Sequence, residues 1–539
     1  MESLRSLDFN LDLVVPDAAP RLQYVVCFVL VGLITKSMTS YLWRSFQEQR
    51  KGYGAIPRYP QLDPFLGLDV VFAMVSSLKK HTYLMWLRNL HVAGKAKTVT
   101  YNFFGTRFIH TTEPENMKAI FATPVWKHFG VAPLRRNNRA TMPFADRGVG
   151  TVDGHEWEFS KSLIKPGFAR EAVIDTQRLE EHTDNLLSLI SEDGSTFDMQ
   201  MLLQRWFLDT STHFMFGEPI GCLLHPKRAN VAWAMTEVLR GLRFRLMMVR
   251  WLWLFRHKAW FDAIDVVHAY VNRLIDNAYA DLAQQQQRRR QQAVAADGTN
   301  GGNRSTVATE ETPERTDLLW SMIPHFGEDK ERLRSEMLVL FAPNNDTTAI
   351  LISNVFWNLA RRPDVYAKVR EEVLSHGPDA QLTYERLRSM KYLDAVLNET
   401  HRLYPVNLTQ TRTCLKDSTL PVGGGKDRKL PIYIKKGDIV RVDKVTMFRD
   451  KDLWGEDADE FRPERWSGVS PSWRFMPFGG GPRRCPAQTM ATVEASYCVA
   501  RFARRFKALE NRDANPSYVP IIRVSPVHKN GVQISAVRA

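Results

Sequence analysis

Phe478-Gly479-Gly480-Gly481-Pro482-Arg483-Arg484-Cys485-Pro486-Ala487-Gln488 is the stretch that decides the fold of this chain. A metal-binding thiolate needs close backbone approach, which glycines permit, and nearby N–H groups or cations that stabilise the negative sulfur. A helical pattern follows from Met490 to Arg504, and the N-terminus of such a helix adds to that stabilisation. The stretch therefore predicts that Cys485 ligates a metal, with Arg483 beside it to pair with an anionic group.

The five cysteines of this 539-residue chain do not suggest a disulfide framework. Their number is odd, their spacings are scattered, and no two are spaced like the ligands of a zinc or iron–sulfur site. We therefore expect a reducing environment and a metal that is bound by one cysteine only. The five are Cys27, Cys222, Cys414, Cys485 and Cys498.

The formal net charge of +14 is compatible with a nucleic acid, an anionic membrane or an acidic protein as partner. No nucleic-acid motif occurs in the sequence, so we expect no nucleic acid as a partner. The basic excess fits the docking of an acidic redox protein.

Segments with helical periodicity dominate the chain, which predicts a mainly α fold with small β-sheets. Residues 284–313 are rich in Gln, Arg, Gly, Asn and Thr and predict a flexible loop within one catalytic domain over 53–539. Helices are expected over residues 178–190, 231–275, 332–359 and 364–375, and extended segments over 99–101 and 430–442.

Residues 22–43 are mostly apolar, with Lys36 near the end of the run, and are long enough for a transmembrane helix. The basic residues that follow favour a cytosolic C-terminal side. We therefore expect an N-terminal segment over 1–52 that anchors the catalytic domain to membrane lipid. The apolar stretch Leu246–Phe255 is expected either to enter the membrane interface or to be part of the core.

The stretch around Cys485 resembles the signature of the cytochrome P-450 family, Phe-x-x-Gly-x-Arg-x-Cys-x-Gly. Phe478, Gly481, Arg483 and Cys485 match, and Ala487 replaces the last glycine. The resemblance implies that Cys485 is the axial ligand of the iron of haem b, with Phe478 and Arg483 in the cofactor site.

Two further motifs match the family in the expected order. Glu399 and Arg402 are spaced to share a helix face, and the resemblance implies a structural network with Arg465. Trp157 and Lys161 resemble the family's Trp-x-x-x-Arg pair, which binds a haem propionate. Lysine keeps the charge there but loses the bidentate fork of arginine. Arg412 is placed where many relatives have another propionate-binding arginine.

Asp346 and Thr347 resemble the acid–threonine pair that delivers protons to bound oxygen in this family. A pair that caps the helix backbone is the alternative interpretation. Pro343 and Asn344 depart from the family's small residues. Because proline lacks an N–H group, we expect a kink in this helix.

These resemblances imply a membrane-bound monooxygenase of the endoplasmic reticulum, with its catalytic domain in the cytosol. It would use O2 and electrons from an NADPH-linked reductase to oxidise a hydrophobic small molecule. The motifs look like those of fungal alkane and fatty-acid hydroxylases, but tailoring of a polyketide, terpenoid or peptide stays open. An oxygen-independent isomerase or dehydratase of the same fold, or a non-catalytic haem-binding protein, also stays open.

Overall fold

The computed structural model describes residues 50–169, 176–248, 252, 257–297 and 315–539, with scattered residues between 24 and 46. The chain divides into two compact units. The first consists of Met1–Met142, Glu237–Asp262 and Thr409–Thr446, and the second of Pro143–Thr236, Ala263–Leu408 and Met447–Ala539. Residues of the predicted catalytic domain, 53–539, contribute to both units.

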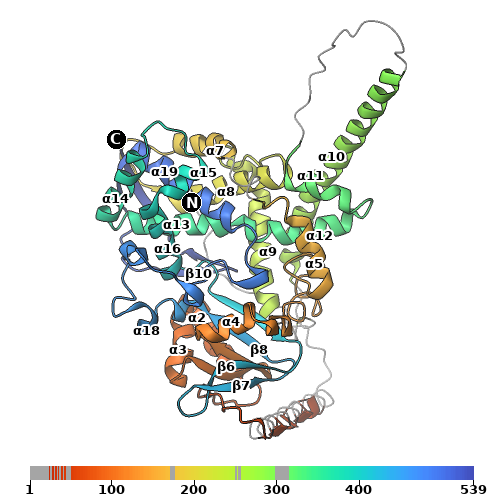
Figure 1. Ribbon diagram of the computed structural model, residues 1–539, viewed down its shortest axis with the longest axis vertical. Coiled ribbons are helices and arrows are strands. Elements are labelled where there is room, and N and C mark those ends of the chain that lie inside the picture. Colours follow the sequence, from red (N-terminus) through yellow and green to blue (C-terminus); the bar gives the residue numbers. More distant parts are fainter. Residues whose placement is uncertain are drawn as a thin grey trace. The chain divides into compact units, whose positions relative to one another are not determined.

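The first unit is built around a five-stranded sheet with the strand order β1-β2-β8-β5-β3. A two-residue turn joins β1 to β2, and Phe104 and Gly105 both have positive φ there (48° and 69°), as a tight hairpin requires. Helices α2, α3 and α4 lie beside the strands (Figure 1). The elements are α2 Leu68–Lys79, α3 Tyr83–Gly94, β1 Thr98–Phe103, β2 Thr106–Thr111, α4 Pro114–Phe121, η1 Pro124–His128, β3 Phe129–Gly130, β5 Thr409–Cys414, β6 Ser418–Gly424, β7 Leu430–Ile434 and β8 Ile439–Asp443.

The second unit is mainly helical, and its core surrounds α13, which is buried along nearly its whole length. Two small sheets, β4-β12-β9 and β10-β11, complete it. Its elements are α5 Gly154–Ile164, α7 Gln177–Ser188, β4 Phe197–Asp198, α8 Met199–Phe216, η2 Pro226–Arg228, α11 Leu318–Met322, η4 Ile323–His325, α12 Lys330–Phe341, η5 Pro343–Asn345, α13 Thr347–Leu359, α14 Pro363–Ser375, α15 Tyr384–Ser389, α16 Lys391–Leu403, α18 Lys451–Trp454, η6 Pro463–Trp466, η7 Ser472–Arg474, η8 Gly481–Arg483, α19 Gln488–Arg505, β9 Phe506–Asn511, β10 Pro520–Ile522, β11 Pro526–His528 and β12 Gln533–Arg538.

The predicted mainly α fold with small sheets is confirmed. The helix expected over 231–275 is two helices, α9 Asn230–Met247 and α10 Lys258–Asp297. A short helix, α17 Lys444–Met447, follows β8. The extended segment expected over 430–442 is also two elements, because the chain turns between β7 and β8 at Gly437, where φ is 90°.

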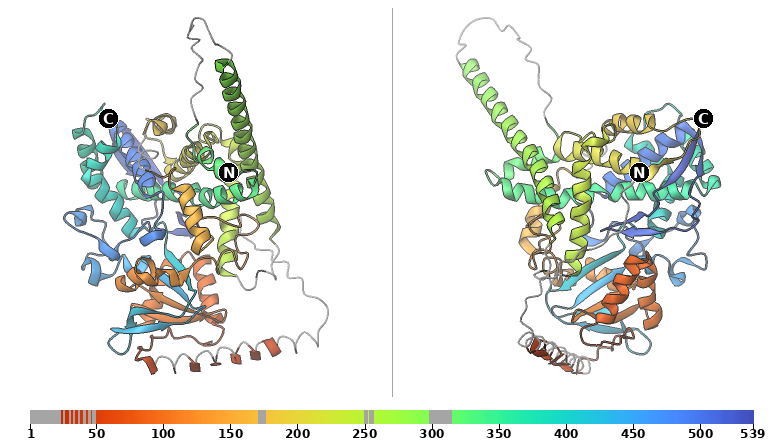
Figure 2. Two further views of the ribbon diagram at one scale, coloured as in Figure 1. Left: turned by 45° about the vertical axis from the view of Figure 1, so that its right-hand side comes forward. Right: turned by 180° about the vertical axis from the view of Figure 1, so that it is seen from behind.

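The predicted loop over 284–313 is wrong in its first part. Helix α10 continues to Asp297, since Gln, Arg and Ala are all good helix formers even where no large apolar side chain is present. Both views of Figure 2 show the end of this helix projecting as a long rod. Residues 298–313 lie outside the described residues.

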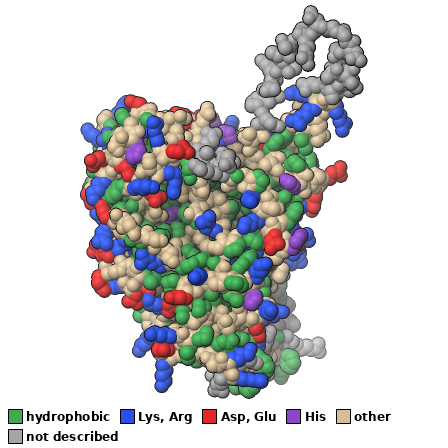
Figure 3. Space-filling model, in the orientation of Figure 1, with side chains coloured by type: hydrophobic (Ala, Val, Ile, Leu, Met, Phe, Trp, Pro, Cys, Tyr) green, Lys and Arg blue, Asp and Glu red, His purple; other side chains and the backbone are tan. Residues whose placement is uncertain are grey.

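Only scattered residues of the predicted anchor over 22–43 are described, and these are helical; of the stretch Leu246–Phe255, residues 246–248 and 252 are described. Within the part of the chain that the structure describes, no helix is both long and apolar enough to cross a membrane. Basic and acidic side chains are interspersed over the face shown in Figure 3.

Candidate functional site

The loop that carries Cys485 is a tight turn built on glycines. Gly479 and Gly481 have φ of 77° and 65°, a region that residues with a side chain rarely adopt. A Cβ atom on Gly480 would lie 2.5 Å from the ring of Trp473, so the backbone passes too close to that ring for a larger residue. The amide N–H of Cys485 donates to the carbonyl of Phe478 (3.0 Å), which closes the loop three residues before α19 begins.

Cys485 differs in its exposure from three other cysteines of the chain. Its side chain is partly exposed, whereas Cys222, Cys414 and Cys498 are buried. Burial raises the pKa of the Cys414 thiol to about 12 and raises the pKa values of Cys222 and Cys498 further. Those three thiols are poor thiolate ligands, which leaves Cys485 and the exposed Cys27 as the reactive sulfurs, and Cys485 is the one that follows the glycine loop.

Trp157, Lys161 and Arg483 lie together in the second unit, as the resemblance implied. The guanidinium of Arg483 lies 4.5 Å from the centre of the Trp157 ring, and the ammonium of Lys161 lies 5.0 Å from it. Arg483 also donates to the Asp153 carboxylate (2.7 Å), and Lys161 donates to the carbonyl of Pro482 (3.0 Å). Arg483 of the cysteine loop and Lys161 of α5 therefore lie side by side, and their hydrogen bonds join the loop to the N-terminal end and the last turns of α5.

These residues fit a haem. A partly exposed cysteine follows a loop that only glycines can form, and two cations beside a buried tryptophan suit the anionic propionates of the cofactor. Phe478 packs edge-on against His401, with 4.9 Å between the ring centres. Arg412 belongs to the first unit, where it is buried in β5 with its guanidinium 5.1 Å from the Phe121 ring.

Glu399, Arg402 and Arg465 form one buried network. The Glu399 carboxylate accepts two hydrogen bonds from Arg402 (2.8 and 2.9 Å) and one from Arg465 (3.4 Å). It also accepts from the Trp466 indole and the Arg462 amide. Arg402 donates further to the carbonyls of Phe448 and Glu460. The network therefore joins α16 to the chain segment that leads to the cysteine loop.

The helix expected over 332–359 is interrupted, in agreement with the predicted kink. Helix α12 ends at Phe341, Pro343–Asn345 form a single 3-10 turn, and α13 begins at Thr347. The Asp346 backbone (φ −143°, ψ −13°) is not helical. Asn344 is buried and its amide points to the Met215 sulfur at 3.6 Å. Proline removes one helical N–H, which explains why the helix breaks here.

Asp346 is 3% exposed, and its Oδ2 atom has no hydrogen-bond partner among the described residues. Burial raises the pKa of Asp346 to about 6, against the lowering influence of the positive charge of Arg523. Thr347 is half-buried at the first position of α13. No side chain caps the N-terminus of α13, so the structure does not support the alternative interpretation of Asp346 and Thr347 as a capping pair.

Asp346 lines a cavity of about 200 Å³ in the second unit. Gln204 and Arg205 of α8, Trp233 of α9 and Arg523 of the β10–β11 hairpin also line it. The Gln204 amide nitrogen is buried without a hydrogen-bond partner in the described part of the chain. A donor and an acceptor that both lack partners suit ordered water, which can bridge such groups. The sequence offered no signal for Gln204 or Arg523, because neither belongs to a spaced motif.

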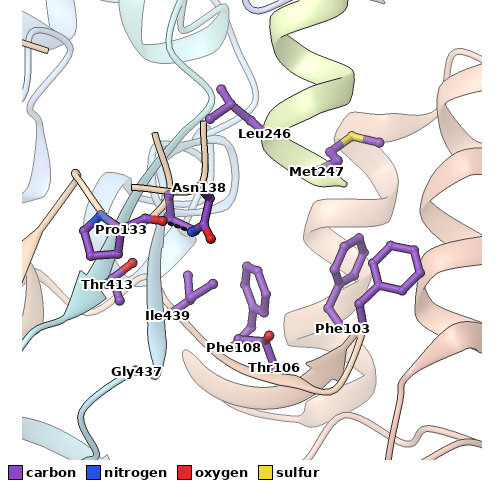
Figure 4. A pocket seen from close by; sticks show the side chains of 12 residues that line it. Phe103, Thr106, Phe108, Pro133, Asn138, Leu246, Met247, Thr413, Gly437 and Ile439 are labelled. Carbon is purple, nitrogen blue, oxygen red and sulfur yellow. Dashed lines mark hydrogen bonds between the residues drawn. The ribbon is translucent and has the colours of Figure 1, made fainter. Parts of the chain in front are cut away.

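A second cavity, of about 210 Å³, lies in the first unit and is mainly apolar (Figure 4). Phe103 and Phe108 approach it from the β1–β2 hairpin, Leu246 and Met247 from the end of α9, and Ile439 from β8. Such a lining can hold an apolar portion of a small molecule.

Known proteins resemble this chain over nearly all of its length. The model of the cytochrome P-450 family matches residues 57–526. The cytochrome P-450 monooxygenase apdE of Emericella nidulans is 53% identical over 495 residues, which cover 92% of this chain and 91% of the relative. The monooxygenase iccC of Talaromyces variabilis is 51% identical (91% and 94% covered), and iliC of a Neonectria species is 46% identical (95% and 95% covered). With a family match that spans both units and the cysteine loop in the family's form, the chain belongs to the cytochrome P-450 family and is a haem-dependent monooxygenase.

Proposed function

We propose that this chain is a membrane-anchored monooxygenase that oxidises a hydrophobic small molecule with electrons from an NADPH-linked reductase. The observation that supports it most is the cysteine loop, where the partly exposed Cys485 follows the glycine turn while Cys222, Cys414 and Cys498 are buried. Similarity to fungal monooxygenases supports the same reaction class.

Within this proposal, Cys485 ligates the haem iron, and Arg483 and Lys161 pair with propionates beside Trp157. Phe478 contacts the cofactor, and Arg412 is a further propionate partner. Glu399, Arg402 and Arg465 hold the segment that carries the loop. A haem held by these residues would supply oxygen activation: with electrons from the reductase and with protons, one oxygen atom would enter the substrate and the other would leave as water.

Asp346 is proposed to hold and release the protons of this reaction. A carboxyl whose pKa is about 6 exchanges its proton readily near neutral pH, and its unpartnered oxygen faces a cavity that can hold water. The Thr347 hydroxyl, next along the chain, would pass the proton on. Arg523 limits how far the pKa of Asp346 rises.

The substrate is proposed to be a specialised metabolite that this enzyme tailors, in preference to a fatty chain. Pro343, Asn344 and Lys161 depart from the common pattern, and the helix interruption gives Asp346 a setting of its own. The same interruption keeps an oxygen-independent isomerase as a second candidate, and a requirement for NADPH and reductase distinguishes the two.

The test is a reduced carbon monoxide difference spectrum of the membrane-expressed protein. Wild type and Cys222→Ala should both show the long-wavelength Soret band of thiolate-ligated haem, and Cys485→Ala should lack it. Absence of the band in folded, haem-supplied wild type would refute the proposed ligand. A band that survives in Cys485→Ala would do the same.

We also propose that residues 22–43 anchor the chain in the endoplasmic reticulum membrane, with the catalytic residues in the cytosol. The apolar run followed by Arg44, Arg50 and Lys51 supports this orientation. A chain that lacks residues 1–52 should be released from membranes by alkaline carbonate, whereas the full chain should remain bound. Equal extraction of both would contradict the anchor.

A further inference from the structure

We propose that the first unit contains a zinc site formed by His91, His110 and Asp443. His91 lies in the last turn of α3, His110 in β2 and Asp443 at the end of β8. One ligand atom from each residue lies within 4.8 Å of the others, and all three side chains are buried. No spaced motif links them, because they meet only when the helix packs on the sheet.

The separations within the cluster fit a shared cation better than direct hydrogen bonds. The Nε2 atoms of His91 and His110 lie 3.5 and 3.9 Å from Oδ2 of Asp443. Hydrogen bonds between such atoms are shorter, at about 2.7–3.2 Å. Zinc bonds of about 2.0–2.1 Å in a tetrahedron place the ligand atoms about 3.3 Å apart. Small side-chain shifts would therefore complete the site.

His110 gives a second, independent observation. It is 0% exposed, and neither of its ring nitrogens has a hydrogen-bond partner within the described residues. A buried polar group without a partner is costly, so a ligand that accepts its lone pair would remove the deficit.

The surroundings of the other two residues orient them as metal ligands. The carbonyl of Ala96 can only accept, so Nδ1 of His91 (3.1 Å away) carries the hydrogen and Nε2 keeps its lone pair toward Asp443. The amide and hydroxyl of Thr446 donate to the Asp443 carboxylate (3.2 and 2.6 Å).

Two neutral imidazoles and one carboxylate are a donor set that zinc binds, with the fourth position left for water. Arg441 opposes the binding, since its positive charge acts on His110 from the neighbouring strand position. The site would join α3 to β2 and β8.

The experiment uses the full-length, haem-loaded protein, purified in metal-free buffer, incubated with one equivalent of ZnCl2 and desalted. Zinc and iron are measured by plasma mass spectrometry. We expect about one zinc per haem in wild type, and at least a fivefold loss in His110→Gln and in Asp443→Asn. His528→Gln, which removes a buried histidine of the second unit, is the matched control and should keep its zinc.

The carbon monoxide spectrum of each variant reports whether the haem site still folds. X-ray absorption at the zinc edge of wild type tests the ligands without any substitution, and should show nitrogen and oxygen only. Less than one zinc per ten folded chains, sulfur in the zinc coordination shell, or unchanged zinc in both variants would overturn the proposal.

Discussion

Replacing Asp346 by asparagine should make the protein more stable near neutral pH while slowing its reaction. The pKa of this buried carboxyl is about 6 in the folded chain, against an ordinary value of 3.8. The folded state thus holds the proton more tightly, so the contribution of Asp346 to stability is fully present below pH 3.8 and is lost as the pH rises through about 6. Above that range the ionised carboxylate costs the folded state about 3 kcal/mol, because one pKa unit corresponds to about 1.4 kcal/mol.

Asparagine preserves the shape and removes the charge, so the gain should appear in the same pH window. Between about pH 5 and about pH 7.5, the advantage of Asp346→Asn in the free energy of unfolding should grow by roughly 1.4 kcal/mol. Urea denaturation at both pH values, followed by tryptophan fluorescence at matched haem content, measures it. The rate of product formation by Asp346→Asn at neutral pH should be at least tenfold lower than that of wild type.

Asp262→Asn is the matched control, since that carboxylate is 55% exposed and pairs with Lys258 on the surface of α10. It should change neither stability nor turnover by a comparable amount. Two results would contradict this prediction: a lower free energy of unfolding for Asp346→Asn than for wild type, or an increase that is the same at both pH values. Either would mean that ionised Asp346 does not destabilise the folded state.

Three other substitutions test the site. Arg402→Ala should lower the free energy of unfolding by about 3–5 kcal/mol and release haem, because it leaves the Glu399 carboxylate buried without its main partner. The control Lys258→Ala removes an exposed pair and should cost under about 1 kcal/mol. Equal urea midpoints for the two variants would refute the buried network. Arg523→Gln should move the pH dependence of Asp346 to higher pH, since Arg523 lowers that pKa, and a pH–rate profile that stays in place would argue against their coupling. Lys161→Arg should slow haem transfer to apomyoglobin severalfold through a bidentate propionate contact; faster transfer would count against that contact.

The sequence anticipated features that depend on neighbouring residues in the chain. The glycine turn before Cys485, the Glu399–Arg402 pair and the break at Pro343 all follow from local spacing or from the geometry of one residue type. The helical pattern of 231–275 predicted one helix where the structure has α9 and α10, because both helices continue the same helical periodicity. Polar composition alone misassigned residues 284–297, whose helix propensity is high.

Contacts between distant segments were beyond the sequence. The cavity beside Asp346 forms where α8, α9 and the β10–β11 hairpin pack together. The sequence around Gln204 or Arg523 does not predict that packing. The cluster of His91, His110 and Asp443 likewise depends on how a helix packs on a sheet. Residue spacing carries no information about such packing, since each partner is common in other surroundings.

The burial of Cys222, Cys414 and Cys498 makes the haem ligand addressable by thiol reagents. Thiols with strongly raised pKa values react slowly with maleimides and oxidants, so alkylation of the folded units is directed to Cys485. In a Cys27→Ser background, bound iron would shield that sulfur and cofactor departure would expose it. The rate at which Cys485 is labelled would therefore measure the rate of haem loss. Oxidation of Cys485 should likewise begin once the cofactor has left.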